Sequence, residues 1–302
     1  MPAQLLSRIL FQFFLLAAQA GSLLLLVLAR FGQTPPDRLQ IPAILFLGAI
    51  LSGPVFALAR GHDSRWLGRS ISLALVLNAG LALLLSQTSP DFSLTWLLAP
   101  ATAMLVTLGL RLLSADRGDM FSAMIVYGAS TVLANYTLDS FLPLGNFFLV
   151  NVGTFFFGVT FTQRDRVHRY GRRNVYLMIA VAALANVVMS LAIDTPIRYV
   201  MVAFASILVA ETADTEIYQR LLHLPWLARV AGSNAVSAPL DTIIFTLLAF
   251  WGEPFATPGW MTQVIVTDIL VKYGASILVA AGVIGWLRRG TAPAAAAVRH
   301  NV

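Results

Sequence analysis

The sequence lacks cysteine entirely and carries little charge. Of its 302 residues none is Cys and only 11% are charged. The missing cysteine excludes disulfides, thiol nucleophiles and thiolate metal sites. A soluble domain typically carries about 25% charged residues, so the low charge excludes a sizeable water-soluble domain. Lysine occurs once, as Lys272, although the formal net charge is +6.

Long apolar runs take the place of the missing charge. Hydrophobic residues make up 58% of the chain and the mean hydropathy is +0.78. Runs of about 18–25 apolar residues match the thickness of a bilayer core. We therefore expect an all-α polytopic membrane protein with about ten transmembrane helices. The expected spans are Leu5–Ala29, Ile41–Ala59, Ser70–Ser86, Leu94–Leu113, Phe121–Leu138, Leu144–Phe161, Val175–Ile193, Tyr199–Leu221, Val230–Trp251 and Met261–Leu287. The first run is long enough to span and no small-residue cleavage site follows it, so no cleavable signal peptide is expected.

The connections between these spans alternate in charge. Arginine gathers in every second connection, whereas the others are poor in Arg and contain Pro, Ser and Asp; only Gln33–Gln40 is ambiguous. By the positive-inside rule, ten spans then place both termini in the cytoplasm of a bacterial inner membrane. This clustering beside apolar runs also accounts for the positive charge without a nucleic-acid partner. The arginines concerned are Arg60, Arg65, Arg69, Arg111, Arg117, Arg164, Arg166, Arg169, Arg172, Arg173, Arg220, Arg229, Arg288 and Arg289.

The two parts of the chain differ in their membrane-embedded polarity. The first four spans hold little beyond Gln12, Gln19 and Asn78, whereas the last six hold nearly all the intramembrane acids and amides. We therefore divide the chain into an accessory four-helix membrane bundle (1–118), a six-helix transporter core (119–289) and a disordered cytoplasmic tail (290–302). The role of the N-terminal bundle is open.

Acidic residues in the core point to a solute path. Ionisable side chains at membrane depth usually face a bundle interior or polar cavity and mark a substrate or ion pathway. Glu211, Asp214 and Tyr218 fall on one face of a helix. Glu216 and Arg220, four residues apart, are expected to form a structural ion pair near the cytoplasmic end.

The last two spans add further polar candidates. Asp268 and Lys272 are also four residues apart and can neutralise each other. They form either a self-contained packing pair or a functional group, in which they relay charge or Lys272 competes with the substrate for a carboxylate. Asp241 follows Pro239, which is expected to kink a cavity-lining half-helix. The candidate substrate-binding residues are Asn135, Asn151, Glu211, Asp214, Tyr218, Asn234, Ser237, Asp241, Asp268 and Lys272, with Asp165 as candidate gate.

Five ordered motifs carry a family resemblance. Over about residues 121–287 the chain resembles the vitamin uptake transporter family, whose best-understood members are queuosine precursor transporters. The motifs are Asn135-Tyr136, Asp165 to Gly171, Asp214 to Arg220, Asn234 to Trp251, and Asp268-x-x-x-Lys272. The resemblance implies a six-helix core similar to the substrate-binding subunits of energy-coupling-factor transporters, and import of a 7-deazaguanine precursor (preQ0 or preQ1).

Two features depart from the family pattern. Arg164 stands where the family has Thr before the loop aspartate, and the first 118 residues have no counterpart in six-helix members. The first core helix also lacks the Ala-x-x-x-Ala spacing with which binding subunits dock on an energising module. An ATPase partner is therefore not expected, and the sequence leaves homo-oligomer formation open.

The expected contacts with the substrate follow from the hydrogen-bond donors of the 7-deazaguanine ring. A 7-deazaguanine offers adjacent N1–H and 2-amino donors, and one carboxylate can accept both in a bidentate pair. We expect Glu211 or Asp214 to bind that edge, and Asn151 or Asn234 to meet the carbonyl. An aromatic side chain, Tyr218 or Phe250, would stack on the ring.

Other functions stay open on the sequence alone. Another vitamin-like solute such as biotin, or proton-coupled transport, would use similar residues. An intramembrane enzyme is a second class, but a serine hydrolase needs a membrane-embedded Ser–His pair, and the four histidines (His62, His168, His223 and His300) fall in loops or the tail. A non-transporting receptor is a third class. We expect no catalytic activity and no cofactor or metal, with partners limited to a small solute and lipid.

Overall fold

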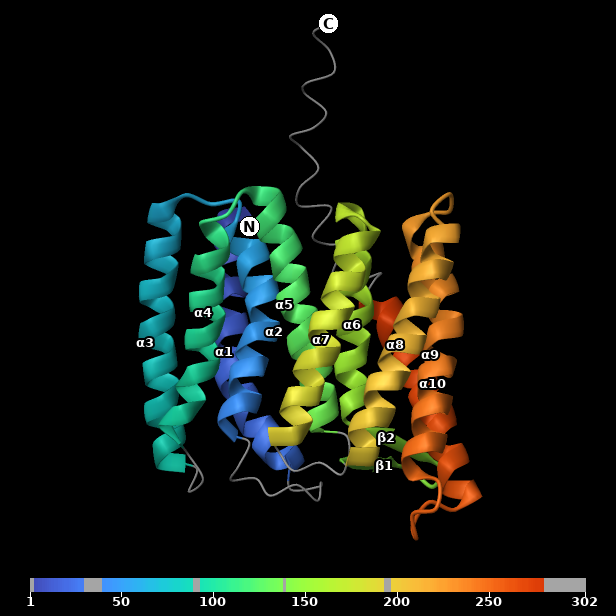
Figure 1. Ribbon diagram of the computed structural model, residues 1–302. Helices are drawn as coiled ribbons and strands as arrows, with labels where there is room; N and C mark the ends of the chain where they lie inside the picture. The colour runs from blue at the N-terminus through green and yellow to red at the C-terminus, as the bar shows by residue number, and fades with distance from the viewer. Residues whose placement is uncertain (1–2, 30–39, 89–92, 138–139, 193–196, 280–302) are drawn as a thin grey trace, which may run out of the picture.

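The computed structural model describes residues 3–29, 40–88, 93–137, 140–192 and 197–279, and its helices stand side by side (Figure 1). The predicted tail at 290–302 lies outside this range. The α-helices are α1 (Ala3–Ala29), α2 (Gln40–Ala59), α3 (Ser64–Thr88), α4 (Leu98–Arg111), α5 (Ala115–Tyr136), α6 (Gly153–Val167), α7 (Arg172–Ala192), α8 (Ile197–Arg220), α9 (Trp226–Phe250) and α10 (Pro258–Val279). Short 3₁₀ helices, η2 (Leu94–Leu97) and η3 (His168–Tyr170), precede α4 and α7.

Six of these helices are long and apolar enough to cross a membrane: α1, α2, α3, the η2–α4 segment, α7 and α9. The chain is therefore a multi-pass, helical membrane protein. Helix α6 has only 15 residues, and α8 carries Glu211, Asp214 and Glu216 in its second half. Neither of these two core helices meets the length and hydropathy expected of a membrane span. The ten-span topology therefore stays a prediction.

A β-hairpin replaces the first part of one predicted span. Strand β1 (Phe141–Leu144) pairs antiparallel with β2 (Phe148–Asn151), and Phe141 faces Asn151 in the register. Gly145 turns the chain with a φ of +66°, a conformation that glycine adopts without steric cost. The expected helix Leu144–Phe161 is therefore wrong in its first half, since helix α6 starts only at Gly153.

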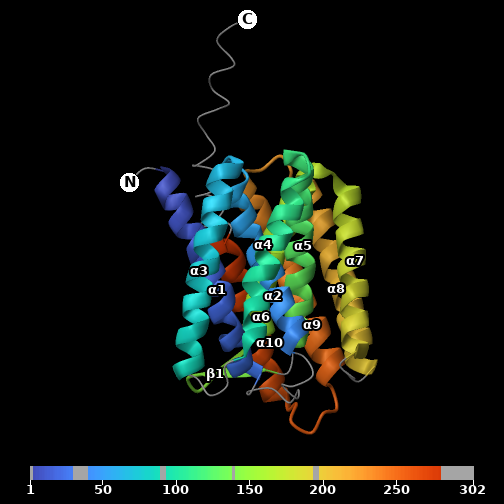
Figure 2. The same ribbon diagram turned by 90° about the vertical axis from the view of Figure 1, so that its left-hand side faces the viewer.

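The two ends of the molecule differ as the charge alternation predicts. The connections α2–α3, α4–α5, α6–α7 and α8–α9 lie at the upper end in Figure 1. The hairpin and the α9–α10 connection lie at the lower end, and Figure 2 agrees on the position of β1. We call the upper end the arginine-rich end and the lower end the hairpin end.

The N-terminal helices join the core through α2. Helix α2 packs on α1, α4 and α5, and it approaches α4 so closely that a Cβ on Gly48 would lie 2.4 Å from the Ala99 carbonyl oxygen. Ala43 and Ile50 of α2 share a buried cluster with Leu133 of α5. Small residues permit such close backbone approach in membrane bundles.

Candidate functional site

A cavity lies among α5, the hairpin, α6, α8, α9 and α10. It encloses about 470 Å³ of empty space, a volume that includes space open to solvent. Its polar lining residues are Asn135, Asn151, Thr154, Ser206, Asp241, Thr246, Asp268 and Lys272. Its aromatic lining residues are Phe141, Phe157, Phe245 and Phe250. Polar groups set in an apolar wall are the usual composition of a ligand site.

Lys272 forms an ion pair between two helices of the cavity wall. Its Nζ lies 2.8 Å from Asp241 Oδ2 on α9 and donates to Thr242 Oγ1 at 2.9 Å. It also sits 4.7 Å from the centre of the Phe157 ring, a cation–π distance. Ser206 of α8 donates to the other Asp241 oxygen at 3.0 Å. The predicted pairing of Lys272 with Asp268 on its own helix is therefore wrong, because the cross-helix acid takes the ammonium group.

Asp268 is held by neutral donors instead of by a cation. The Thr154 hydroxyl donates to its Oδ1 at 2.8 Å, and the Asn151 backbone N–H donates to the same oxygen at 3.4 Å. Asn151 Oδ1 in turn accepts from the Gly153 N–H at 2.8 Å, which satisfies a free donor at the start of α6. The hairpin, α6 and α10 thus meet at Asp268, one wall of the cavity.

Asn135 and Phe250 complete the opposite walls. Asn135 donates to Asn186 Oδ1 on α7 at 2.7 Å. Phe250 makes edge-on contacts with Phe141, Phe255 and Trp260, at ring-centroid distances of 6.4, 6.0 and 5.3 Å. Phe141 and Phe250 of this aromatic cluster line the cavity.

A second polar group lies about one helical turn beyond the cavity, toward the arginine-rich end. Arg164 of α6 is fully buried, with Nη1 2.8 Å from Glu211 Oε2 and Nη2 2.7 Å from Asp214 Oδ2. Nη2 also donates to Asn234 Oδ1 at 3.2 Å. We call Arg164, Asp165, Glu211, Asp214 and Asn234 the Arg164 cluster. The interpretation of Arg164 as part of a cytoplasmic arginine loop is wrong, because it is a buried bridge between α6, α8 and α9.

The remaining predicted site residues surround this cluster. Ser237 donates to Asp214 Oδ1 at 2.6 Å. Tyr218 stacks on the ring of His168, with a centroid distance of 4.5 Å and an interplanar angle of 20°. Gln219 Nε2 lies 3.0 Å from His168 Nδ1. Burial, and then the positive charge of Arg164, lower the pKa of His168 to about 3, so this ring is neutral at physiological pH.

Among the described acids near this site, Asp165 has the fewest hydrogen bonds. Its side chain is fully buried, and neither carboxylate oxygen has a hydrogen-bond partner. The nearest cationic atom, Arg164 Nε, lies 3.7 Å from Oδ1, beyond hydrogen-bond distance. Within the same described segments, no group of three or more His, Cys, Asp or Glu side chains could hold a metal ion.

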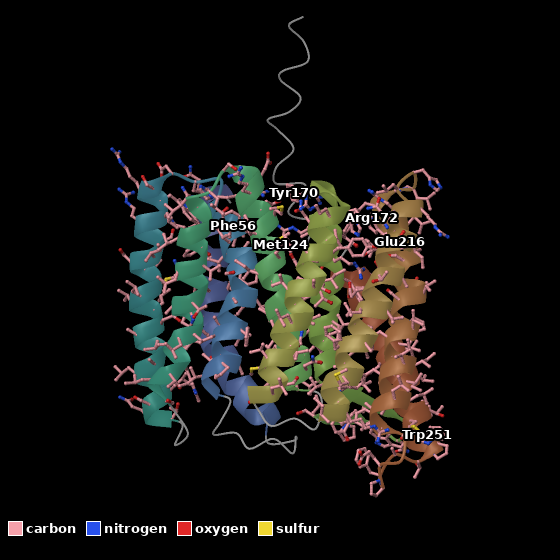
Figure 3. The ribbon with its side chains drawn as sticks, viewed as in Figure 1. Phe56, Met124, Tyr170, Arg172, Glu216 and Trp251 are labelled. Atoms are coloured by element: carbon pink, nitrogen blue, oxygen red, sulfur yellow. The ribbon has the colours of Figure 1, made fainter. Side chains whose placement is uncertain are left out.

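The predicted ion pair between Glu216 and Arg220 is also replaced by a contact across helices. Glu216 Oε1 accepts from Arg172 of α7 and from the Tyr176 hydroxyl. Figure 3 shows Arg172 and Glu216 beside each other near the arginine-rich end. Both side chains are partly exposed, so this pair fastens α7 to α8 at the surface.

The structure therefore separates the predicted residues into two groups. Asn135, Asn151, Asp241, Asp268 and Lys272 line the cavity. Glu211, Asp214, Asn234, Ser237 and Tyr218 lie in or beside the Arg164 cluster. Sequence reasoning missed Thr154, Phe157 and Arg164. These three residues are three and then seven positions apart, so they share one face of α6 with Phe161. This helical spacing is the sequence signal that could have identified them.

Comparison with known proteins agrees with the motifs. A family model described as "putative vitamin uptake transporter" matches residues 151–286. This segment begins at the end of β2 and runs through α10, so it holds most of the cavity wall and the whole Arg164 cluster. Neither the curated proteins nor the solved structures gave a match. Over residues 151–286 this multi-pass membrane protein is thus similar to the vitamin uptake transporter family, as its motifs predict.

Proposed function

We propose that this protein imports a small planar heterocycle across a bacterial inner membrane, and that the solute is a queuosine precursor of the 7-deazaguanine class. The cavity carries the proposal, because it combines aromatic walls with an acid whose hydrogen bonds, among the described residues, come from neutral donors. Asp268 and the ion pair of Asp241 with Lys272 give the lining a net charge of −1 when all three are ionised. Such a lining favours a ligand that brings N–H donors or one positive charge.

Asp268 is the group that we assign to the donor edge of the ring. Its two hydrogen bonds come from Thr154 and Asn151 and both end on Oδ1. A carboxylate offers about four lone-pair sites, so it retains capacity for a bidentate pair with adjacent N–H groups. This assignment replaces Glu211 and Asp214, whose carboxylates bind Arg164.

Aromatic and amide groups supply the remaining contacts. Phe250 and Phe157 line the cavity, and ring stacking favours a flat solute over an aliphatic one. Asn135 presents an amide from α5 for the ring carbonyl. A vitamin that carries a carboxylate, such as biotin, would place its charge near Asp268. The lining therefore favours an aminomethyl 7-deazaguanine over biotin.

The test is counterflow in proteoliposomes. Vesicles loaded with unlabelled preQ1 should take up labelled preQ1, and external preQ1 or preQ0 should compete where biotin does not. Asp268→Asn should reduce this uptake, whereas Glu216→Gln at the exposed α7–α8 contact should leave it unchanged. A wild-type protein that exchanges biotin but not preQ1 would contradict the substrate assignment, and binding without exchange would identify a receptor.

We further propose that residues 1–118 form an accessory bundle and that transport needs no ATPase subunit. The cavity residues all come from α5–α10 and the hairpin, which supports the division near residue 118. Helix α2 nevertheless covers Val126 and Leu133 of α5. Rescue of queuosine in the tRNA of a precursor-requiring host, by the full chain and by a form starting near Met120, tests whether that cover is required.

A further inference from the structure

The Arg164 cluster closes the route from the cavity to the arginine-rich end. Ile207 lines the cavity, and Glu211 lies one turn farther along α8, about 6 Å by helical rise. On α9, Ser237 lies one turn from Asp241 in the same direction. Because Arg164 joins α6 to α8 and α9 at this level, a solute leaving the cavity toward the arginine-rich end must separate these contacts.

The cluster contains more acid than base. Asp165, Glu211 and Asp214 are buried with 6% or less of their surface exposed, and Arg164 is the cation among them. Three ionised carboxylates around one guanidinium would leave a net charge of −2. Uncompensated charge in a membrane interior is costly, so the observed arrangement is favourable only when the cluster holds at least one proton.

The position of the proton follows from the contacts. Glu211 accepts from Arg164 at 2.8 Å, and Asp214 pairs with Arg164 at 2.7 Å and accepts from Ser237 through its other oxygen. Asp165 has no such donor on either oxygen. The carboxylate that gains least from being ionised is the one that retains the proton.

We propose that Asp165 is a proton-binding site, separate from the solute cavity, and that release of its proton toward the arginine-rich end opens the Arg164 cluster. The transport part of this inference rests on the proposed function. The O–H bond of Asp165 breaks, its proton passes to water at the arginine-rich end, and the electron pair stays on the carboxylate. Ionised Asp165 then competes with Glu211 and Asp214 for Arg164, which weakens the bridge between α6 and the α8–α9 pair. One solute enters with one proton.

The groups that face Asp165 come from several elements. Arg164 lies beside it on α6, Glu211 and Asp214 face it from α8, and Arg229 acts on it from α9. The Tyr218 and His168 rings lie at the same level, and Tyr127 of α5 is adjacent to Glu211.

Infrared spectroscopy of the purified full-length protein tests the proton without any solute. At neutral pH the wild type should show the carbonyl stretch of a protonated carboxylic acid. Asp165→Asn should lose this band, and Asp165→Glu should shift it. Asp119→Asn should leave it unchanged, because Asp119 is ionised in its pairs with Arg60 and Arg166. Gel filtration confirms that each variant is folded. A band that persists unchanged in Asp165→Asn would overturn the proposal.

Transport in proteoliposomes then tests the coupling, with labelled preQ1 as the probe. One proton per solute allows about tenfold accumulation for each unit of inward pH gradient. Asp165→Asn should lose this response, and Asp119→Asn should keep it. Gradient-driven accumulation that persists in Asp165→Asn would overturn the coupling. A wild type that moves no preQ1 even in counterflow would contradict the proposed substrate, whereas the infrared band would still decide the proton site.

Discussion

Lys272 donates to Asp241 on the neighbouring helix at 2.8 Å, although Asp268 lies only one turn away on its own helix. Two acids that look equivalent in the sequence therefore differ in the structure. Asp241 is a neutralised member of the α9–α10 contact, and Asp268 is held by the Thr154 hydroxyl and a backbone N–H. This difference determines which acid is available to a solute.

The Lys272–Asp241 pair should be energetically coupled. Lys272→Met leaves Asp241 as an uncompensated buried charge, which typically costs about 3–5 kcal/mol. The double variant Lys272→Met/Asp241→Asn should recover much of this loss, because both charges are then absent. Thermal unfolding in detergent of the four proteins in the cycle gives the coupling. The same cycle between Lys272 and Asp268 should give a smaller value; equal values would contradict the observed pairing.

Asp268 and Glu211 should respond differently to loss of charge. Asp268→Asn keeps an oxygen that can accept from Thr154 but removes the ionised acceptor, and hydrogen bonds to charged groups contribute about 1.5–3 kcal/mol. Solute affinity should therefore fall by about tenfold to a hundredfold, with little change in unfolding temperature. Glu211→Gln should act mainly on stability and on opening, because Glu211 binds Arg164. Isothermal titration with preQ1 measures the affinities. A larger loss of affinity in Glu211→Gln than in Asp268→Asn would indicate that Glu211, and not Asp268, binds the ring.

Arg164 should be required for folding. Arg164→Leu leaves the buried acids Glu211 and Asp214 without their cation, at a cost of about 3–5 kcal/mol. Arg164→Lys should recover only part of this, since an ammonium group cannot reproduce the forked contacts of a guanidinium. Arg172→Gln is the matched control. It removes an exposed contact to Glu216, and such pairs contribute up to about 1 kcal/mol. The yield of monodisperse protein and its unfolding temperature should be lowest for Arg164→Leu, intermediate for Arg164→Lys and closest to the wild type for Arg172→Gln.

His168 should make stability depend on pH. Burial and the neighbouring arginines lower its pKa in the folded protein to about 3, from an ordinary value of 6.5. Between these two values the unfolded chain binds a proton that the folded protein does not, so stability falls as the pH decreases from about 6.5 toward 3. His168→Gln should flatten this slope in unfolding temperature. His223→Gln, at an exposed turn residue, should leave the slope unchanged, and an unaltered slope in His168→Gln would contradict the assignment.

The sequence predicted the helices and the charged ends well because both follow from local patterns. Apolar length and arginine spacing are sufficient to position most helices, and the face shared by Glu211, Asp214 and Tyr218 is buried as the helical period requires. The hairpin is not predicted because Leu144–Phe161 is mostly apolar and long enough for a span. Its turn signal, Pro143 to Asn146, falls at the edge of that predicted span.

The partners of the charged residues could not be predicted, because they depend on the packing of helices far apart in the chain. Spacing within one helix favours pairs of Lys272 with Asp268 and of Glu216 with Arg220. In the structure Lys272 pairs with Asp241, and Glu216 pairs with Arg172. Arg164 lies among surface arginines in the sequence, and only the contact of α6 with α8 and α9 identifies it as buried. The division of the acids between cavity and Arg164 cluster follows from the same packing.

The hairpin allows the chain to change in length beside the cavity without a change in the cavity wall. Adding one residue to a helix turns every later side chain by about 100°. Residues added at the tip of β1–β2, beyond the pairing of Phe141 with Asn151, would leave Thr154 and Asp268 where they are. Homologues that differ in length at this tip should therefore keep the same cavity wall, because Phe141 and Asn151 line the cavity from the base of the hairpin.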